Sequence, residues 1–243
     1  MNQKRVLVTG GGTGIGLAIA QQLASDNHQV TISGRSAETL TEAGLPYVVM
    51  DVTSEASVDS AFSELGTVDI LISNAGAAQT APLLKTPLAT WQAMLDVNLT
   101  GAFLCARAAL PPMIDGGWGR MVVIASTSSL KAYPYTGAYT ASKHGVMGLV
   151  KTLAIELART GVTVNAVCPG FSDTPLLTRS VENIVHTTGM NEEQALAALL
   201  KDNPMKRAVD PAEVAAAVRY LVSDDAAATN GQAVVIDGGE LAG

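Results

Sequence analysis

Cysteine is scarce in this sequence. Only two of the 243 residues are cysteines, Cys105 in a helical stretch and Cys168 just after an expected strand. Two separated cysteines supply neither a disulfide framework nor the clustered ligands that a metal site needs. We therefore expect both to be reduced core residues, and we expect no metal.

Charged residues and long apolar runs are also few. Charged side chains make up 15% of the chain, the formal net charge is −7, and no run of Lys and Arg occurs. The electrostatic footprint of a nucleic-acid binder is missing. The first apolar run, Val6–Thr9, is broken by Gly10 long before it could form a signal peptide or a membrane span. These absences predict a cytoplasmic protein without nucleic-acid or membrane partners.

Apolar residues, by contrast, make up 48% of the chain, enough for one substantial core. Short β-branched runs alternate with segments of helical period, the pattern of a parallel sheet covered by helices on both faces. We therefore predict one α/β domain over residues 1–243. Its seven expected strands are Arg5–Thr9, Gln29–Ser33, Tyr47–Met50, Asp69–Ser73, Arg120–Ala125, Thr163–Val167 and Ala233–Ile236.

Three longer segments have distinct expectations. One long helix should run from about Leu88 to Met113, where the Pro111-Pro112 pair stops or kinks it. A second should run from about Gly137 to Thr160. Residues 175–206 interrupt the strand–helix alternation with two short helices, and we predict that they form a mobile lid over a substrate.

A glycine-rich loop follows the first expected strand. It reads Thr9-Gly10-Gly11-Gly12-Thr13-Gly14-Ile15-Gly16 and leads into an apolar helical run. Such a loop lets backbone N–H groups approach a pyrophosphate at a helix N-terminus, where the dipole and unpaired donors favour an anion. A flexible surface turn is the alternative. The position between a first strand and a helix favours the nucleotide site.

The glycine spacing in this loop is Gly-x-x-x-Gly-x-Gly, at Gly10, Gly14 and Gly16, and here the sequence resembles the short-chain dehydrogenase/reductase family. It looks most like the 3-oxoacyl-thioester reductases and polyketide ketoreductases of that family. The resemblance covers essentially the whole chain and continues in the family's order through Asp51-Val52, Asn74-Ala75-Gly76, Asn98, Ser126, Tyr139-x-x-x-Lys143, Pro169-Gly170 and Thr174. It implies a single-domain Rossmann fold and NAD(P)-dependent hydride transfer between nicotinamide and a carbonyl or secondary alcohol.

The resemblance also implies which residues contact the cofactor. Asp51 is similar to the family's adenine contact, Asn74 lies in a turn next to the cofactor, and Thr174 holds the nicotinamide carboxamide. From the residues alone, either of Asp51 and Asn74 could be only a solvated residue at the end of a strand or a turn former. The expected cofactor-binding residues are Gly10, Thr13, Gly14, Ile15, Gly16, Arg35, Asp51, Val52, Asn74, Ala75, Gly76, Tyr139, Lys143, Pro169, Gly170 and Thr174.

Tyr139 and Lys143 lie four residues apart in a helical stretch, so their side chains share one face. An ammonium about 4 Å from the phenol is worth roughly 4 kcal/mol at an effective dielectric near 20, enough to lower the Tyr pKa from about 10 to about 7 at most. By itself this spacing also occurs in exposed helix pairs. Ser126, at the end of the fifth expected strand, favours the catalytic interpretation because such ends face the ligand crevice.

By resemblance, four residues carry the chemistry. Tyr139 is the acid/base, Lys143 tunes it and binds the nicotinamide ribose, and Ser126 orients and polarises the carbonyl. Asn98 supports a proton relay toward Lys143 through a water. The alternatives are that Ser126 only bonds its own backbone and that Asn98 only bends its helix.

Cofactor preference is predicted from the end of the second strand, Thr31-Ile32-Ser33-Gly34-Arg35. Where NAD-preferring relatives carry Asp, the chain has Gly34, and the Arg35 guanidinium suits a 2′-phosphate. Many NADP-binding relatives carry a second basic residue just before the middle glycine of the glycine loop, and its absence at Thr13 speaks against NADP(H). Because the repelling carboxylate is missing and Arg35 offers a contact to the phosphate, we favour NADP(H) over NAD(H).

Three functions fit these residues. The first is reduction or oxidation of a 3-oxoacyl or 3-hydroxyacyl thioester, for which the lid residues Arg179, Lys201, Lys206 and Arg207 offer contacts to a CoA phosphate unless they are simply solvated. The second is a dehydrogenase of a sugar, steroid or cyclic alcohol, and the third a nucleotide-sensing protein without turnover. Small residues along two long helices (Ala141, Gly145, Gly148 and Thr152; Gly101, Cys105 and Ala108), together with the resemblance, predict a homotetramer.

Overall fold

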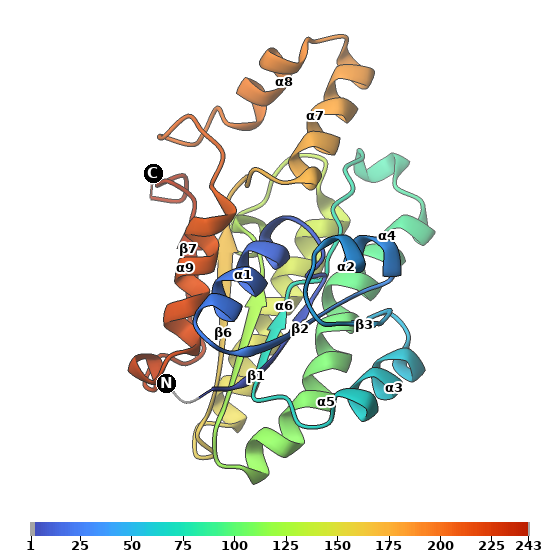
Figure 1. Ribbon diagram of the computed structural model, residues 1–243. Helices are drawn as coiled ribbons and strands as arrows, with labels where there is room; N and C mark the ends of the chain where they lie inside the picture. Colours follow the sequence, from blue (N-terminus) through green and yellow to red (C-terminus); the bar gives the residue numbers. More distant parts are fainter. Residues whose placement is uncertain (1–2, 243) are drawn as a thin grey trace.

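The computed structural model describes residues 3–242. A parallel sheet of seven strands forms the centre of the molecule (Figure 1). The order β3-β2-β1-β4-β5-β6-β7 reverses direction between β1 and β4, and this is the switch point where such sheets bind ligands. All seven predicted strands are confirmed, with ends shifted by at most two residues. They are β1 (Arg5–Thr9), β2 (Gln29–Gly34), β3 (Tyr47–Val49), β4 (Ile70–Ser73), β5 (Gly119–Ile124), β6 (Val162–Pro169) and β7 (Ala233–Ile236).

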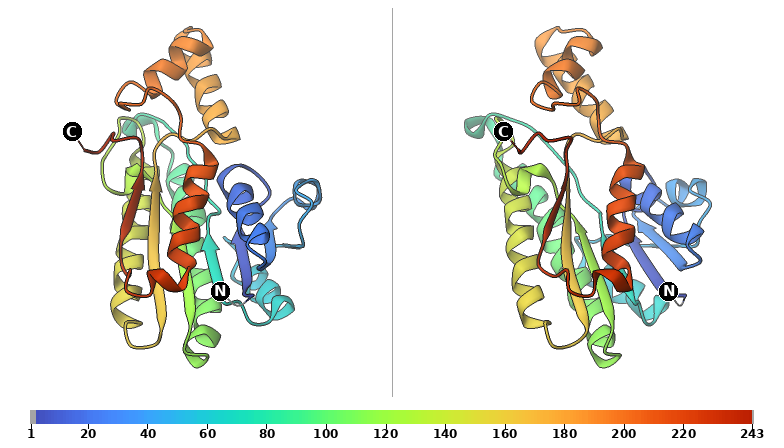
Figure 2. Two further views of the ribbon diagram at one scale, coloured as in Figure 1. Left: turned by 60° about the vertical axis from the view of Figure 1, so that its left-hand side comes forward. Right: turned by 90° about the vertical axis from the view of Figure 1, so that its left-hand side faces the viewer.

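Helices cover both faces of the sheet (Figures 1 and 2). Alternate strand residues point to opposite faces, so Val6 and Val8 pack with α1 and α9 while Leu7 packs with α3, α5 and α6. The two apolar layers fix the helices on the sheet by burial. The elements beside the strands are α1 (Gly14–Ser25), α2 (Ala37–Glu42), α3 (Glu55–Leu65), α6 (Gly137–Glu156), α9 (Pro211–Val222) and the short 3₁₀ turns η1 (Leu83–Lys85), η3 (Thr127–Ser129) and η4 (Asp224–Ala226).

The first long helix is built from three pieces. These are α4 (Leu88–Leu95), a π-helical turn η2 (Asp96–Thr100) and α5 (Gly101–Asp115). The expected stop at Pro111-Pro112 is wrong, because the chain stays helical to Asp115 and the Gly116 N–H still donates to the Pro112 carbonyl at 3.0 Å. By length and composition, Leu88–Asp115 is the one helix of residues 3–242 that could cross a membrane, but half of its most apolar window is buried inside the molecule.

Two further boundaries differ from the prediction. Helix α6 ends at Glu156 rather than Thr160, because the backbone N–H and the hydroxyl of Thr160 both donate to the Leu157 carbonyl (2.9 and 2.8 Å) and tighten the chain into a turn. Cys168 lies within β6 instead of after it. Both cysteines are buried and free, as expected.

The predicted lid consists of α7 (Pro175–Thr188) and α8 (Glu192–Leu199), which stand above the sheet (Figure 2). Its two connections to the domain meet, because the Asp173 N–H donates to the Val209 carbonyl (2.9 Å) and the Val209 N–H to the Phe171 carbonyl (2.8 Å). The two predicted short helices are confirmed. The two segments that connect them to the rest of the domain are hydrogen-bonded to each other.

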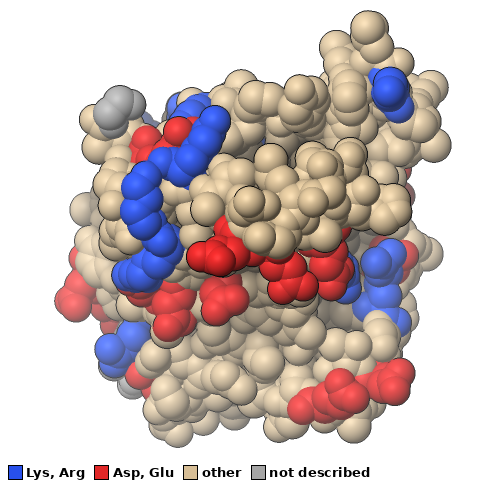
Figure 3. Space-filling model, turned by 90° about the horizontal axis from the view of Figure 1, so that it is seen from above, with Lys and Arg blue, Asp and Glu red and all other residues tan. Residues whose placement is uncertain are grey.

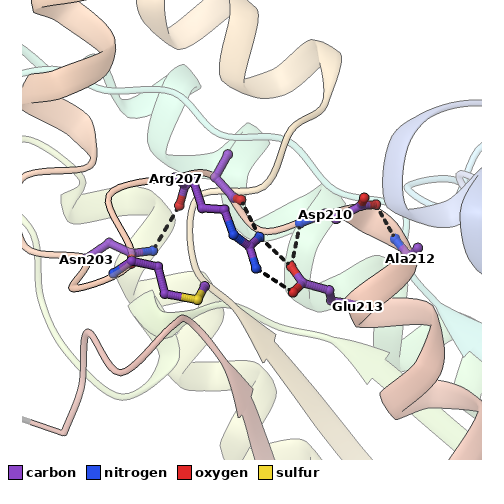
Figure 4. Close-up of polar contacts among 7 residues, drawn as sticks. Asn203, Arg207, Asp210, Ala212 and Glu213 are labelled. Carbon is purple, nitrogen blue, oxygen red and sulfur yellow. Dashed lines mark hydrogen bonds and ion pairs between the residues drawn. The ribbon is translucent and has the colours of Figure 1, made fainter.

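An ion pair holds the second connection of the lid (Figure 4). Two nitrogens of the Arg207 guanidinium donate to the two Glu213 carboxylate oxygens (2.8 and 2.7 Å), and the Asp210 N–H donates to the same carboxylate (2.8 Å). These bonds lower the pKa of Glu213 to about 2. Arg207 is thus paired with Glu213 at the start of α9, although its side chain stays 49% exposed.

Candidate active site

The glycine loop forms a cradle of backbone groups at the start of α1. Gly14 has a φ of +54°, a conformation that L side chains rarely adopt, and a Cβ on Gly12 would come within 3.1 Å of the Thr39 side chain. Thr13 is the N-cap residue, but its exposed side chain makes no capping hydrogen bond. The first N–H groups of α1 thus have no side-chain acceptor, and such donors at a helix N-terminus fit an anion such as a pyrophosphate.

Asn74 braces this loop from the neighbouring strand. Its amide group donates to the carbonyls of Thr9 (2.9 Å) and Gly10 (3.0 Å), while the N–H groups of Asn74 and Ala75 donate to the Thr9 hydroxyl at 3.0 Å each. A Cβ on Gly16 would come within 2.4 Å of the Asn74 amide nitrogen. Asn74 therefore shapes the loop through backbone contacts, and the role of Thr9 was missed because only the sheet order brings β1 and β4 together.

The lid begins beside the same loop. Thr174 is the N-cap residue of α7, and its side-chain carbons lie 3.1 and 3.2 Å from the position of a Cβ on Gly14. Pro169 ends β6, and the Gly170 N–H donates to the Ile236 carbonyl at 3.0 Å. The segment predicted to hold the nicotinamide thus leads directly from the sheet to the phosphate loop.

Tyr139 and Ser126 meet in front of the carboxyl end of β5. Ser126 caps η3, with its oxygen accepting from the Ser128 N–H at 3.0 Å, and its side chain is close enough to the Tyr139 phenol to oppose the rise in the pKa of Tyr139. The alternative that Ser126 bonds its own backbone is therefore also true. Ser126 can serve both purposes because a hydroxyl has two acceptor lone pairs and one donor.

Lys143 is directed into the protein next to Tyr139. Its ammonium donates to the Ile124 carbonyl at 2.9 Å and lies 5.8 Å from the centre of the Tyr139 ring. Burial lowers the pKa of Lys143 to about 8. Burial also raises the pKa of Tyr139, against the smaller opposite effect of the hydrogen bond from Ser126. The expected lowering of the Tyr139 pKa is thus not seen here, because desolvation outweighs a lysine that is bound to a carbonyl.

Asn98 lies at the π-helical turn and is 3% exposed. Its amide nitrogen donates to the Ala77 carbonyl (3.0 Å) and the Ser142 hydroxyl (3.1 Å), and its oxygen accepts from the Ala77 N–H (3.0 Å). A Cβ on Gly76 would lie 2.8 Å from that oxygen and 3.8 Å from the Lys143 ammonium. Gly76 therefore keeps the space between Asn98 and Lys143 open, while Asn98 also holds its helix to the loop after β4.

Two neighbours of this centre were not identified from the sequence. Ser142, fully buried one position before Lys143, accepts from Asn98 and donates to the Tyr139 carbonyl at 2.7 Å. Cys168 lies against the Ser126 N–H and the Lys143 ammonium, and burial raises the pKa of its thiol to about 11. Neither has a motif of its own, so no sequence signal could have found them.

Arg35 and Asp51 lie together at the ends of β2 and β3. Both the N–H and the hydroxyl of Thr53 donate to the Asp51 carboxylate (2.9 and 2.8 Å), and these bonds, with a smaller effect of the Arg35 charge, lower the pKa of Asp51. Arg35 is exposed. Val52, in contrast, is 7% exposed and packs against Gly101, so its side chain belongs to the core.

The face above the strand ends carries both signs of charge. Figure 3 shows its Lys and Arg side chains in separate groups with acidic side chains between them. Among residues 3–242, no group of three or more His, Cys, Asp or Glu side chains is placed to hold a metal ion. The centre thus consists of hydroxyls, one amide and one ammonium around Tyr139, next to a nucleotide cradle.

Comparisons with known proteins agree with this arrangement. Residues 10–240 match a family model described as enoyl-(acyl carrier protein) reductase. D-beta-hydroxybutyrate dehydrogenase of Rhizobium meliloti (strain 1021) is 38% identical, with 97% of this chain and 98% of that protein aligned. The 3-oxoacyl-[acyl-carrier-protein] reductase MabA of Mycobacterium tuberculosis (strain ATCC 25618 / H37Rv) is 39% identical over 97% of this chain and 92% of that protein.

A solved structure extends the likeness to three dimensions. A variant of actinorhodin polyketide ketoreductase, crystallised with NADPH, has a TM-score of 0.91 and 37% identity, covering 98% of this chain and 97% of that one. The chain belongs to the short-chain dehydrogenase/reductase family. It is an oxidoreductase that acts on a carbonyl or alcohol with a nicotinamide cofactor.

Proposed function

We propose that Tyr139, Ser126, Lys143 and Asn98 carry out the reaction. The observation that carries this proposal is the buried Lys143 ammonium, 5.8 Å from the centre of the Tyr139 ring, with Ser126 close enough to affect the pKa of the Tyr139 phenol, at the edge of the sheet where ligands bind. When bound, the nicotinamide cofactor supplies or accepts the hydride. Ser126 orients the substrate oxygen, and Tyr139 gives its phenolic proton to that oxygen as the carbonyl carbon becomes an alcohol carbon.

Lys143 and Asn98 support this step. The Lys143 ammonium, 5.8 Å from the centre of the Tyr139 ring, would donate to the ribose of the nicotinamide half of a bound cofactor. The Asn98 oxygen, across the open position of Gly76, lets a water reach Lys143 and return a proton to Tyr139. In the oxidation direction the same groups act in reverse, and Tyr139 is the base.

The preferred cofactor in this proposal is NADP(H). Exposed Arg35 offers a guanidinium to a 2′-phosphate, and Gly34 brings no carboxylate to repel it. The ketoreductase structure with NADPH supports the same choice. Of the expected contacts, Gly10, Gly14, Gly16, Ala75 and Thr174 lie at the glycine loop through the contacts described above. Pro169 and Gly170 lie at the end of β6, and Ile15 packs partly against the core.

The substrate class is a 3-oxoacyl or 3-hydroxyacyl thioester. Relatives named as a 3-oxoacyl reductase and a hydroxybutyrate dehydrogenase support it. Exposed apolar side chains in η1, at the start of α4 and in the lid suit an aliphatic acyl group. They are Leu83, Leu84, Leu88, Leu176 and Met190.

A panel of substrates tests this function. Purified protein is mixed with NADPH and one of three substrates: acetoacetyl-CoA, a cyclic ketone or crotonyl-CoA. In a separate assay it is mixed with NADP⁺ and an aldose. Nicotinamide absorbance is followed in each case. Rapid turnover of acetoacetyl-CoA is the expected result. Preference for the ketone or the sugar would favour a dehydrogenase of cyclic alcohols or sugars. Preference for crotonyl-CoA would favour an enoyl reductase. Cofactor binding without any turnover would favour a nucleotide-sensing protein.

Location and assembly also belong to this proposal. We place the protein in the cytoplasm as a homotetramer, in which exposed Gly148 and Thr152 of α6 face a second subunit. Gly101 and Cys105 are buried within one subunit and cannot make that contact. Sedimentation at micromolar concentration is expected to give the mass of four chains, and a monomer alone would contradict the assembly.

A further inference from the structure

A buried carboxylate near the C-terminal end of the chain lies close to the proposed active site. The Glu240 side chain is only 3% exposed, although it follows the last strand by a few residues. Asp237 builds the turn that presents it, because its carboxylate oxygens accept from the N–H groups of Gly239 and Leu241 at 2.8 Å each. Lys131 balances the charge, with its ammonium 3.6 Å from the Glu240 carboxylate. The carboxylate is therefore held in a defined place.

Glu240 is joined to the loop between β5 and α6 through Tyr133. The Tyr133 hydroxyl forms hydrogen bonds with the Glu240 carboxylate and, at 2.9 Å, with the Thr127 hydroxyl. A phenol has one proton, and an ionised carboxylate can only accept. Tyr133 must then donate to Glu240, and Thr127 must donate to Tyr133. The negative charge thus sets the direction of both bonds.

Thr127 directly follows Ser126 and belongs to the η3 turn. The N–H of Ser128 in that turn donates to the Ser126 oxygen at 3.0 Å, so the position of η3 determines the position of the Ser126 hydroxyl. The Tyr133 ring also packs edge-on against Phe171, with ring centres 6.3 Å apart. On its other side, Glu240 lies 3.7 Å from the place of a Cβ on Gly170. Glu240 thus stands between the Ser126 turn and the segment that follows β6.

We propose that Glu240, acting through Tyr133 and Thr127, is a positioning residue that holds the Ser126 hydroxyl in place for the substrate oxygen. The proposal rests on the proposed role of Ser126. Glu240 touches no reacting atom. Its contribution is to keep the η3 turn rigid, so that Ser126 needs no rearrangement when the substrate oxygen binds.

Epistasis between the variants tests this proposal. Tyr133→Phe, Glu240→Gln and Glu240→Ala are each made in the wild type and in Ser126→Ala, and single turnovers of acetoacetyl-CoA are measured so that slow residual rates stay measurable. Tyr220→Phe is the control, because it removes a hydroxyl that is hydrogen-bonded to Thr229 at 3.2 Å on helix α9 and has no contact with Glu240 or η3. Cofactor affinity by fluorescence and the thermal midpoint are recorded for every variant.

We expect Tyr133→Phe and Glu240→Ala to lower the turnover rate about tenfold, with cofactor affinity unchanged. The turnover rate of Glu240→Gln should lie between that of Glu240→Ala and that of the wild type, since the new amide oxygen still accepts from Tyr133. In the Ser126→Ala background the same changes should have almost no further effect, because the hydroxyl they position is gone. Equal losses in both backgrounds, or no loss in the wild type, would overturn the positioning role. Full activity of Ser126→Ala itself would instead overturn the proposed function.

Discussion

Thr174 at the start of the lid lies against Gly14 at the start of α1, with its side-chain carbons 3.1 to 3.2 Å from the place where a Cβ on Gly14 would be. The two helix N-termini, one in the domain and one in the lid, thus share one small space. A side chain at position 14 would therefore press on the lid base as well as on the glycine loop.

Gly14→Ala should weaken cofactor binding by at least about tenfold. The change strains a φ of +54° and fills the space next to Thr174; a left-handed conformation costs an L residue roughly 1–2 kcal/mol. Fluorescence titration with NADPH measures the effect. Gly44→Ala is the matched control, because Gly44 also has a positive φ (+70°) but nothing within 4 Å. Equal affinities of the two variants would contradict the cradle.

Tyr139→Phe should lower turnover by roughly a thousandfold or more, while cofactor affinity and folding are retained. The ring keeps its packing, and only the hydroxyl next to Ser126 is lost. Steady-state kinetics with the best substrate of the panel, together with circular dichroism, check this. A variant with more than about a tenth of the wild-type rate would exclude Tyr139 as the acid/base.

Arg35→Ala should weaken NADPH binding about tenfold and leave NADH binding unchanged, since a charge-assisted contact to phosphate contributes about 1.5–3 kcal/mol. Gly34→Asp should shift preference toward NADH, and a Cβ fits there because Leu40 is 3.5 Å away. Titration of both cofactors measures the change, with Arg159→Ala beyond the far end of α6 as the control. Tighter binding of NADH than NADPH by the wild type would contradict this assignment.

Lys143 predicts a pH dependence of cofactor binding and stability. Burial lowers its pKa from 10.5 to about 8, so the affinity of the free protein for NADPH should fall above about pH 8, as the ammonium loses its proton. Between about pH 8 and 10.5 the unfolded chain holds this proton more strongly than the folded one, so the contribution of Lys143 to the free energy of unfolding rises with pH.

Lys143→Met separates these effects from other titrations. The difference between wild type and variant is measured by NADPH titration and by urea unfolding from pH 7 to 10. The variant should lack both the fall in affinity and the rise in stability. Parallel pH curves for the two proteins would show that Lys143 does not titrate in this range.

Local sequence patterns predicted most of the secondary structure and several residues of the candidate site. Strands, the glycine loop and the shared face of Tyr139 and Lys143 follow from periods of two and 3.6 residues and from backbone constraints, which act between near neighbours. The boundary errors at Pro112 and Thr160 were also local, because hydrogen bonds at a helix end depend on its immediate surroundings.

Tertiary structure decided the contacts that make the site work. Ser126 reaches Tyr139, Asn98 reaches Ser142, and Lys143 reaches the Ile124 carbonyl only because the sheet order brings these segments together. The raised pKa of Tyr139 arises from burial that no local pattern displays. Glu240 is hydrogen-bonded to Tyr133 although 107 positions separate them in the sequence. Periodicity acts over a few residues, whereas these contacts depend on which strands are neighbours, and only the packed sheet determines that.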